Sequence, residues 1–331
     1  MIYPIPSGTR DVLPEETREV RAITDTLRSV FERHGYGEVY TPALEYESVL
    51  ARADMAEARP AYRVFDEAGA VLVLRSDMTV PIARVVATRY GSSEPPLRFC
   101  YFAHCYRGVP PQRGQPRELL QAGIELIGSA APEGTAEALT VLSHALDALN
   151  LKDYRVGLGD ASLFPNLMAS LRVPSAAQAE LLEALARRDF VGLEHRLEEA
   201  GIGDEAAALL LELPQRRGGP EVLAHAPDPA VDGMTGMRRV RELLEPNVAR
   251  RVLFDLGLVR NIGYYTGAVF EVYDPALGAP IGGGGRYDEL LGRFGRRLPA
   301  VGFALGIDRL HMALAGEERG TGALLARELA G

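Results

Sequence analysis

Some patterns are scarce or missing in this sequence of 331 residues, and their absence limits the kind of protein it encodes. Only two cysteines are present, Cys100 and Cys105, which excludes a disulfide framework and fits a reducing compartment. No apolar run reaches the roughly 18 residues that a membrane-spanning helix needs. The N-terminus has no basic segment followed by an apolar one, so we predict no signal peptide, no membrane contact and a cytoplasmic location.

Motifs for metal and nucleotide binding are also missing. The six histidines are scattered without metal-ligand spacing, so we predict no metal site. The four consecutive glycines of residues 282–285 match neither GxxxxGK[ST] nor GxGxxG, and we predict no cofactor. Close packing of this backbone against a ligand or a neighbouring strand is the favoured interpretation. No motif supports Cys105 as a nucleophile, and a small buried residue is the better hypothesis.

The sequence does contain enough apolar residues for a large core. Apolar residues make up 47% and charged residues 24%, and a chain of this length forms one large domain or two ordinary ones. The net charge is −9, from 36 basic and 45 acidic residues. This balance argues mildly against a nucleic-acid partner, which usually meets a basic face.

Hydrophobic patterns predict strands joined mostly by hairpins and loops. Pro14, followed by two acids, opens a predicted helix that ends at Gly35. Residues 62–75 predict a β-hairpin, and the helix after Thr79 is expected to bury Val85 among its apolar residues. Further strands are predicted over residues 38–40, 97–106, 119–127, 154–158, from 252 onward and 268–273, and further helices over 135–149 and at the end of the apolar run 299–310.

Residues 258–290 form the stretch around which the rest of the chain is interpreted. They are expected to begin as a strand, with Arg260 just before a tyrosine pair. A second strand ends at the turn signal Asp274-Pro275, and a short helical segment is predicted to open at residues 286–288. Strand, bare glycine backbone and helix start are a way to build the floor and one wall of a small-molecule pocket.

The predicted strands are seldom joined by crossover helices, which favours an α+β fold with an antiparallel sheet and helices packed on it. Residues 163–246 differ in composition, being rich in Ala, Leu and Glu with a helical period that prolines interrupt. They predict an inserted helical subdomain. The predicted division is therefore a core in two parts, residues 1–162 and 247–331, with the inserted region between them.

Polar side chains gather at the predicted strand ends. Carboxylates can hold an amino group, Gln and Tyr can hold an imidazole or amide, and arginine can hold a carboxylate by two parallel hydrogen bonds. The set suits a zwitterionic amino acid better than a phosphate or a sugar, although internal salt bridges between ordinary strand-end residues would explain the same pattern. The candidate residues are Asp77, Thr79, Arg107, Gln121, Glu125, Arg260, Tyr264 and Tyr265.

Five motifs occur in a fixed order along the chain: LRSDMT (74–79), YRGVPPQRGQPRELLQAGIE (106–125), LVRNIGYYTGAVFE (258–271), GGGRYDEL (283–290) and GFALGIDRL (302–310). Together they resemble the catalytic core of class II aminoacyl-tRNA synthetases, and of histidyl-tRNA synthetases in particular. The resemblance covers most of the chain apart from the inserted helical region. It implies a class II synthetase-like antiparallel sheet flanked by helices.

Departures from the synthetase pattern change the expected function. Residues 108–110, Gly-Val-Pro, stand where the synthetases carry a charged stretch with an acidic residue that helps hold ATP. Residues 261–263, Asn-Ile-Gly, stand where they carry Gly-Leu-Asp. The chain also stops soon after Arg309, which leaves no room for an anticodon-binding domain of about a hundred residues. We therefore expect no tRNA partner and no aminoacylation.

This altered pattern is similar to the family of synthetase paralogues that serve as regulatory subunits of ATP phosphoribosyltransferase, the first enzyme of histidine biosynthesis. The resemblance implies a non-catalytic chain that a short catalytic subunit needs for full activity and for feedback inhibition by histidine. It implies a hetero-octamer of four chains of each kind. It also implies a homodimer through the helix of residues 15–33 and the strand that follows.

The resemblance makes the candidate residues a regulatory histidine-binding pocket, with Asp77 in place of the usual Glu. Tyr287 and Arg309 are additional candidates, and Arg309 also matches a synthetase ATP contact, so residual nucleotide binding stays open. Glu125, Asp77 and Gln121 are expected to hold the amino group and the imidazole, while the arginines face the carboxylate. The alternative is that the pocket survives only as scaffolding and that effector histidine binds elsewhere, for example at the subunit interface.

Two other functions stay open. A truncated histidyl-tRNA synthetase-like enzyme would activate histidine with ATP, and histidine-dependent pyrophosphate exchange would distinguish it. A stand-alone amino-acid-binding or modifying paralogue would have no phosphoribosyltransferase partner, which a pull-down from the source cell would test.

Overall fold

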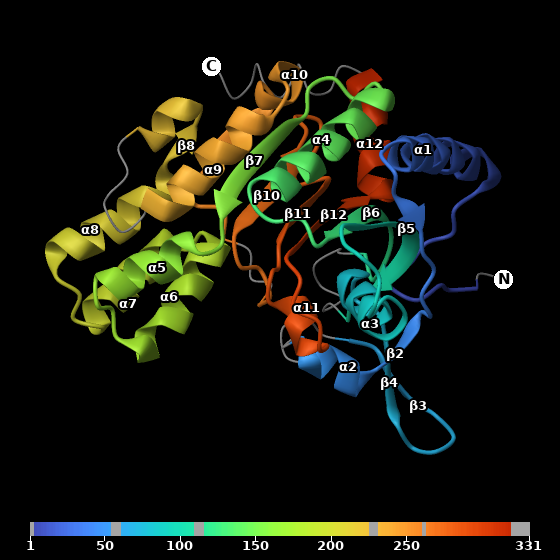
Figure 1. Cartoon of the computed structure of the whole chain (residues 1–331), viewed down its shortest axis with the longest axis horizontal. Coiled ribbons are helices and arrows are strands. Elements are labelled where there is room, and N and C mark those ends of the chain that lie inside the picture. The colour runs from blue at the N-terminus through green and yellow to red at the C-terminus, as the bar shows by residue number, and fades with distance from the viewer. Residues whose placement is uncertain (1–2, 54–60, 109–115, 225–230, 260–262, 319–331) are drawn as a thin grey trace.

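The computed structural model describes residues 3–53, 61–108, 116–224, 231–259 and 263–318. The strands within these ranges are β1 (Gly37–Glu38), β2 (Leu44–Tyr46), β3 (Arg63–Phe65), β4 (Val71–Leu74), β5 (Leu97–Tyr106), β6 (Glu118–Ile127), β7 (Arg155–Asp160), β8 (Arg217–Gly218), β9 (Val252–Asp255), β10 (Ala268–Tyr273), β11 (Gly282–Arg286) and β12 (Ala300–Gly306). Nine of them form one sheet in the order β1-β5-β6-β12-β11-β10-β7-β9-β8, and the order β2-β4-β3 makes a separate small sheet (Figure 1).

The large sheet is mixed. Its centre, from β5 through β6, β12, β11 and β10 to β7, is antiparallel, as the sequence predicts. The pairs β1–β5 and β7–β9 are parallel, so the prediction of a wholly antiparallel sheet is wrong for these two pairs. Parallel neighbours need a long connection, and both pairs are linked by segments that contain helices.

One face of the sheet is covered by the helices α1 (Pro14–Arg33), α4 (Glu133–Ala148) and α12 (Ile307–Glu318), which lie together in Figure 1. The apolar stripe of α1 places Leu27 and Phe31 in the core without exposure. They meet Ile124 of β6 and Phe303 of β12, whose alternate residues point to this face. Because these side chains are buried on this face, the residues that alternate with them along each strand point to the opposite face of the sheet.

The opposite face carries α3 (Thr79–Arg89), α11 (Leu290–Arg293) and α2 (Glu47–Arg52). A second apolar cluster forms there and includes Ile82 of α3, Tyr101 of β5 and Leu290 of α11. Val85 is only partly buried, so the prediction that it lies in the core is wrong, whereas the hairpin predicted over 62–75 is confirmed by the β3–β4 pair.

The glycine run forms a strand of the large sheet. Residues 282–285 lie in β11 between β10 and β12, and a Cβ added at Gly284 would overlap the carbonyl oxygen of Gly302 and lie 2.8 Å from the ring of Phe270. Close packing of this backbone against neighbouring strands is therefore confirmed. Arg286 ends β11 and α11 starts at Leu290, so the predicted helix start at 286–288 is wrong.

The prediction that residues 258–290 begin as a strand is also wrong, because β9 ends at Asp255 and β10 begins only at Ala268. The turn predicted at Asp274-Pro275 is present. Arg260 lies outside the described residues.

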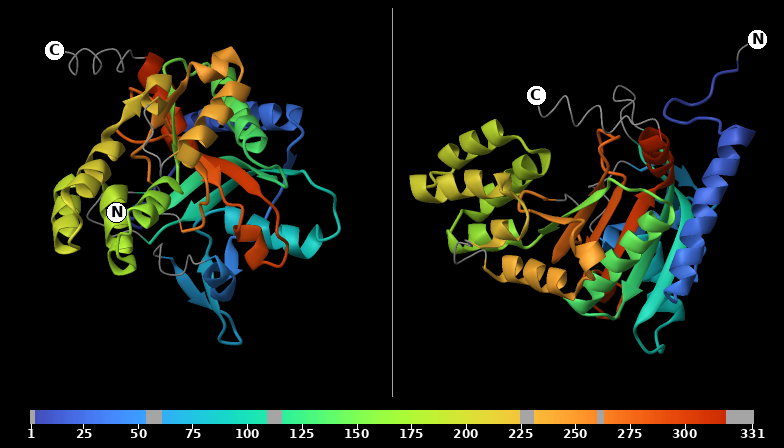
Figure 2. Two further views of the ribbon diagram at one scale, coloured as in Figure 1. Left: turned by 60° about the vertical axis from the view of Figure 1, so that its left-hand side comes forward. Right: turned by 90° about the horizontal axis from the view of Figure 1, so that it is seen from above.

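The region 163–246 contains helices that project beyond the sheet on the side away from α1 (Figure 2). It also supplies the edge strand β8, and Arg217 of β8 and Arg188 lie 3.6 and 3.0 Å from the buried Asp255 carboxylate of β9. The predicted division into a core and an inserted subdomain stays a prediction. The helices here are α5 (Leu163–Ser170), α6 (Ser175–Arg187), α7 (Phe190–Glu199), α8 (Asp204–Glu212), α9 (Val231–Leu243) and α10 (Pro246–Ala249).

No helix in the described part of the chain combines the length and the apolar character that crossing a bilayer requires.

Replacing Gly284 by alanine tests the close packing of β11. The added methyl group has no space, so the free energy of unfolding is expected to fall by about 1–3 kcal/mol or more. Gly278 has nothing within 4 Å of an added Cβ, so the control Gly278→Ala is expected to change it by less than about 0.5 kcal/mol. Urea unfolding followed by circular dichroism measures both variants, and equal stability would contradict the packing account.

Candidate functional site

A cavity of about 160 Å³ opens on the α3 side of the large sheet. This is smaller than the roughly 300–1,000 Å³ of pockets for drug-sized ligands, and it suits a ligand of amino-acid size. It brings together nine of the ten residues that the sequence nominates, while Arg260 lies outside the described residues. The nine are Asp77, Thr79, Arg107, Gln121, Glu125, Tyr264, Tyr265, Tyr287 and Arg309.

The floor of the cavity consists largely of backbone. Gly283 of β11 and Gly302, Ala304 and Gly306 of β12 line it. Strand alternation turns the large side chains of β12, Phe303 and Leu305, toward the face that α1, α4 and α12 cover. Gly302 stands opposite Glu125 of β6, and a Cβ added there would overlap the Glu125 Oε2 atom. The missing side chains are therefore what makes room for the cavity and for the carboxyl group in it.

Glu125 is the most deeply buried acid of the site, with 1% of its surface exposed. The Thr79 hydroxyl donates to its Oε1 atom over 2.6 Å, and the Tyr287 hydroxyl donates to Oε2. Burial raises the pKa of Glu125 to about 8; the two hydrogen bonds oppose the rise, and the nearby charge of Asp77 adds to it. This carboxyl group is therefore mostly protonated at neutral pH.

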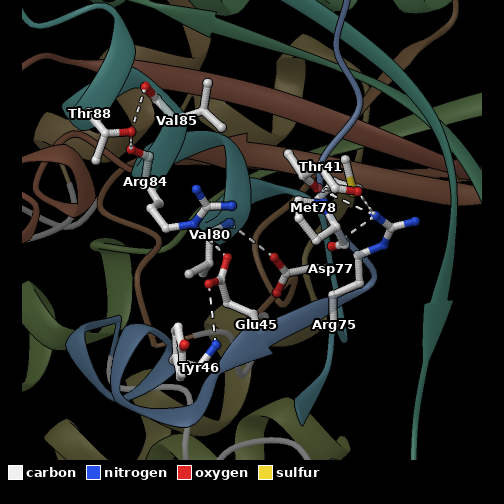
Figure 3. Close-up of polar contacts among 11 residues, drawn as sticks. Thr41, Glu45, Tyr46, Arg75, Asp77, Met78, Val80, Arg84, Val85 and Thr88 are labelled. Carbon is white, nitrogen blue, oxygen red and sulfur yellow. Dashed lines mark hydrogen bonds and ion pairs between the residues drawn. The ribbon is translucent and has the colours of Figure 1, made fainter. Parts of the chain in front are cut away.

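Asp77 is held at the start of α3. Its Oδ1 atom accepts a hydrogen bond of 3.1 Å from the backbone N–H of Val80, as acids do near a helix N-terminus (Figure 3). Arg75 fixes the preceding backbone by donating to the carbonyl oxygens of His104 (2.8 Å) and Thr41 (2.7 Å). Such anchoring on both sides gives the short Asp77 side chain a defined position at the cavity wall.

A partly buried ion pair joins Glu45 to Arg84 of the same helix, with 2.6 Å between the Arg84 Nε and Glu45 Oε2 atoms (Figure 3). Arg84 belongs to α3 and Glu45 to β2, so the pair joins the helix that carries Thr79 to the small sheet.

Aromatic rings form one wall. The Tyr264 ring stands edge-on to Tyr265 and Tyr287, with centroid distances of 5.2 and 5.7 Å. Tyr265 reaches the cavity over Gly285, where an added Cβ would lie 2.9 Å from its ring. Rings with hydroxyl groups offer both a flat apolar surface and hydrogen-bonding partners, which suits an imidazole ring.

Two arginines line the other part of the cavity. Gln121 pairs with Gly306, which lies beside the Arg309 side chain, whereas Glu125 lies four residues further along β6, or about 13 Å at the usual strand rise. The Arg309 guanidinium donates to the carbonyl oxygen of Pro280 over 2.6 Å. The backbone N–H of Arg107 donates to the backbone carbonyl oxygen of Arg117 at the base of the β5–β6 hairpin. The cavity thus has an acidic end and a basic end.

Tyr101 and Glu271 also line the cavity, although sequence reasoning did not nominate them. Glu271 is the one charged residue of β10 and interrupts an apolar run, which is a signal that could have found it. Tyr101 is buried and belongs to the second apolar cluster, and nothing in the sequence distinguishes it from a core tyrosine.

The cysteines and histidines, for which the sequence predicts no catalytic or metal-binding role, are not among the residues that line the cavity. Cys100 and Cys105 are both buried, as predicted for Cys105, and burial raises the pKa of the Cys100 thiol to about 12. His34 and His144 contact each other between α1 and α4, with 3.1 Å between Nε2 and Nδ1. Over the described ranges, no three His, Cys, Asp or Glu side chains are grouped so that they could hold a metal ion.

Comparison with known proteins identifies the family. The histidyl-tRNA synthetase family model matches residues 8–310. The ATP phosphoribosyltransferase regulatory subunit of Desulforamulus reducens is 40% identical over 313 residues, which cover 93% of this chain and 78% of that protein. The protein of the same name from Symbiobacterium thermophilum is 41% identical over 322 residues, covering 93% of this chain and 79% of that one.

Similar solved structures point to the same family. The crystal structure of an ATP phosphoribosyltransferase regulatory subunit/histidyl-tRNA synthetase from Bacillus halodurans has a TM-score of 0.87 at 32% identity, and covers 95% of this chain and 83% of that chain. A histidine–tRNA ligase subunit from Alicyclobacillus acidocaldarius has a TM-score of 0.80 at 32% identity, covering 96% of this chain and 99% of that chain.

The fold is thus that of a histidyl-tRNA synthetase-like class II core. Within this class, the chain belongs to the ATP phosphoribosyltransferase regulatory subunits, non-catalytic subunits of histidine biosynthesis. The family and the fold class predicted from the five motifs are confirmed.

The pH dependence of stability tests the buried state of Glu125. Its pKa is about 8 in the folded chain against an ordinary value of 4.5 for a glutamate carboxyl group, so the folded state holds more protons between these two pH values. The free energy of unfolding should therefore fall as pH rises through this window, by up to about 1.4 kcal/mol per pH unit from this group. Glu125→Gln removes that contribution, so the stability of wild type relative to this variant should fall between pH 5 and pH 8.

Glu183→Gln is the matched control, because Glu183 is half-exposed on α6 and pairs with Arg187. Its effect on stability should be the same throughout that pH range. Parallel pH profiles for wild type and Glu125→Gln in urea unfolding would show that Glu125 is ionised in the folded chain.

Proposed function

We propose that this chain senses histidine for a catalytic ATP phosphoribosyltransferase subunit, and that the effector binds in the cavity described above. The observation that carries the proposal is the cavity itself, which has buried carboxyl groups and tyrosines at one end and two arginines toward the other. A free amino acid has the complementary arrangement of an ammonium, a side chain and a carboxylate.

Histidine fits the lining group by group. Glu125, Thr79 and Asp77 would surround the amino group, and Gln121 with the tyrosine hydroxyls would hydrogen-bond the imidazole nitrogens. The carboxylate would face the arginines: Arg260, which lies outside the described residues, and Arg107 and Arg309 at the basic end.

Histidine bound in the cavity can regulate the complex only if it favours one conformational state of the assembly over another. A ligand shifts an equilibrium by its difference in affinity for two states, and allosteric coupling is typically about 1–3 kcal/mol. The elements that meet at the cavity, α3, α12 and the hairpin of β5 and β6, come from distant parts of the chain. A ligand that touches all of them can change their relative positions, which supports a sensing role.

The proposal assigns no chemistry to the cavity. The sequence departs from the synthetases at residues 108–110, where they carry a charged stretch that helps hold ATP, and at residues 261–263, where they carry Gly-Leu-Asp. The assembly is proposed to contain four chains of each kind in a cytoplasmic complex, built on homodimers of this chain. The competing hypothesis, in which histidine binds at the subunit interface and the cavity is scaffolding, is an outcome of the first test below.

Variants of the cavity test the sensing site. Glu125→Ala and Arg260→Ala are each expected to weaken histidine binding at least about tenfold, because each removes a charged hydrogen-bonding partner. They should also relieve feedback inhibition of the complex with the catalytic subunit. Isothermal titration of the full chain with histidine measures the first effect, and inhibition of the reconstituted complex measures the second.

Arg187→Ala is the control for these variants, since Arg187 is 73% exposed on α6, away from the cavity. It should leave both binding and inhibition unchanged. If millimolar histidine gives no heat with the wild-type chain, and both cavity variants keep normal feedback inhibition, the cavity is not the sensor.

The mass of the assembly tests the proposed partner stoichiometry. Light scattering of this chain mixed with a short catalytic subunit should give the mass of four chains of each kind, and this chain alone should give a dimer. A stable complex with any other ratio, or no complex at micromolar concentration, would contradict the proposed assembly.

A further inference from the structure

We propose that a junction at Asp255, between the helical region of residues 163–246 and the end of β9, couples occupancy of the cavity to the docking of that region. Arg188 and Arg217 of the helical region meet the buried Asp255 carboxylate there. A ligand in the cavity favours the closed junction, and the closed junction favours the ligand in return. The inference rests on the proposed function, because the ligand is the histidine that the cavity is proposed to bind.

Asp255 is the centre of this junction. The Arg188 Nη2 atom donates to its Oδ2 atom over 3.0 Å, and the Arg217 Nε atom lies 3.6 Å from the same oxygen. Its Oδ1 atom accepts a hydrogen bond of 3.1 Å from the backbone N–H of Gly257. A buried carboxylate depends on such partners, because water does not solvate it where it lies.

Backbone contacts join the same two parts of the chain. β8, which belongs to the helical region, pairs with β9 in an antiparallel ladder. The Leu256 N–H donates to the carbonyl oxygen of Arg216 over 3.1 Å. Gly257 lies so close to Pro214 that an added Cβ would overlap the Pro214 carbonyl oxygen. The helical region therefore holds residues 255–257 through backbone and side chains together.

The two sides of the junction differ in exposure, which allows it to open. The side chains of Arg188 and Arg217 are 52% and 41% exposed, whereas that of Asp255 is 2% exposed. The arginines can exchange the carboxylate for water, since ion pairs near the surface contribute little. Arg188 also has a left-handed backbone, with a φ of 55°, which is unfavourable for a residue with a side chain. Contact with Asp255 offsets that cost only while the junction is closed.

A chain of contacts leads from the junction to the cavity. The Arg217 guanidinium lies 5.2 Å from the centroid of the Tyr273 ring, a cation–π contact. The Tyr273 hydroxyl donates to the Glu271 Oε2 atom over 2.5 Å, and Glu271 lines the cavity. Gly157 of β7 lies between β10 and β9, and an added Cβ there would lie 3.4 Å from the Tyr273 ring and 3.8 Å from the Asp255 Cβ atom. The ring and the carboxylate thus both lie over the bare backbone of β7.

The backbone gives a second connection, because Tyr264 and Tyr265 of the cavity follow Asp255 along the chain. A ligand that contacts Glu271 and the tyrosines restrains both connections, and this favours the closed junction. By linkage, the closed junction raises the affinity for the ligand by the same factor by which the ligand favours closure.

Hydrogen exchange of the full chain, with and without saturating L-histidine, tests the coupling. The amides of Leu256 and Gly257 donate to Arg216 and Asp255, so they exchange when the junction opens. Histidine should slow their exchange by at least about fivefold, the low end of typical allosteric coupling. Arg217→Met removes the charge and keeps an unbranched side chain. It should speed this exchange in the free chain and abolish the response to histidine.

Calorimetric titration of the same variants tests reciprocity. Arg217→Met should weaken histidine binding by the factor by which histidine slows exchange in wild type. Arg188→Met breaks the junction from the corner that follows α6, so the result does not depend on the folding of one variant. Tyr273→Phe keeps the ring and removes the hydroxyl that reaches Glu271, and it should reduce the exchange response while the free chain exchanges as wild type does.

Arg187→Met is the matched control. Arg187 precedes Arg188 in sequence, is 73% exposed and pairs with Glu183 within α6. This variant should bind histidine and respond to it as wild type does. Circular dichroism melting of each variant shows that the fold is retained.

The outcomes separate this proposal from the sensing role. Slower exchange with histidine in wild type, lost together with affinity in Arg188→Met and Arg217→Met, supports the coupling. Histidine binding that leaves the exchange of Leu256 and Gly257 unchanged, or that is as tight in both arginine variants as in wild type, overturns the coupling and leaves the sensing role standing. A full response in Tyr273→Phe overturns the route through Glu271. Absence of any histidine binding to the chain overturns the sensing role, and the coupling with it.

Discussion

The close approach of β11 and β12 is the constraint on which the site depends. Gly284 of β11 lets its backbone approach Gly302 of β12 more closely than a side chain would allow, and Gly302 in turn leaves room for the Glu125 carboxyl group of β6. The same lack of side chains opens the cavity on one face while Phe303 and its neighbours fill the core on the other. Packing and binding therefore use alternate residues of the same strands.

A cavity built in this way has an electrostatic consequence. Within the described residues, Glu125 is buried, accepts hydrogen bonds from the Thr79 and Tyr287 hydroxyls and lies near the charge of Asp77, so its ionisation without a ligand is unfavourable. The basic end is formed by long side chains that reach from the β5–β6 hairpin and from α12. Opposite charges at the two ends suit a small zwitterion. Because Glu125 is hard to ionise in the ligand-free cavity, its protonation depends on the charge of what binds beside it.

The chain has a synthetase-like core, although its family is regulatory. One fold can carry different functions, because function depends on the residues of particular sites. The cavity residues lie on the sheet, on α3 and on α12, where the packing of the core fixes their positions. The sequence departures from the synthetases fall at residues 108–110 and 261–263, apart from the helices and strands that carry the described cavity residues. Substitutions outside such elements can change a function without disturbing the core.

The sequence by itself determined the family, the α+β class and most of the lining of the cavity, because the ordered motifs carry those residues and strand periodicity puts Gln121 and Glu125 on one face. Only the tertiary structure decided that Tyr287 donates to Glu125 across 162 residues of sequence, that β1 pairs in parallel with β5, and that β9 ends at Asp255, before the stretch that begins at Leu258. The reason is physical: a local pattern records which side of an element a residue takes. Strand partners, burial and the protonation of a buried acid depend on groups that are close in space and far apart in the chain.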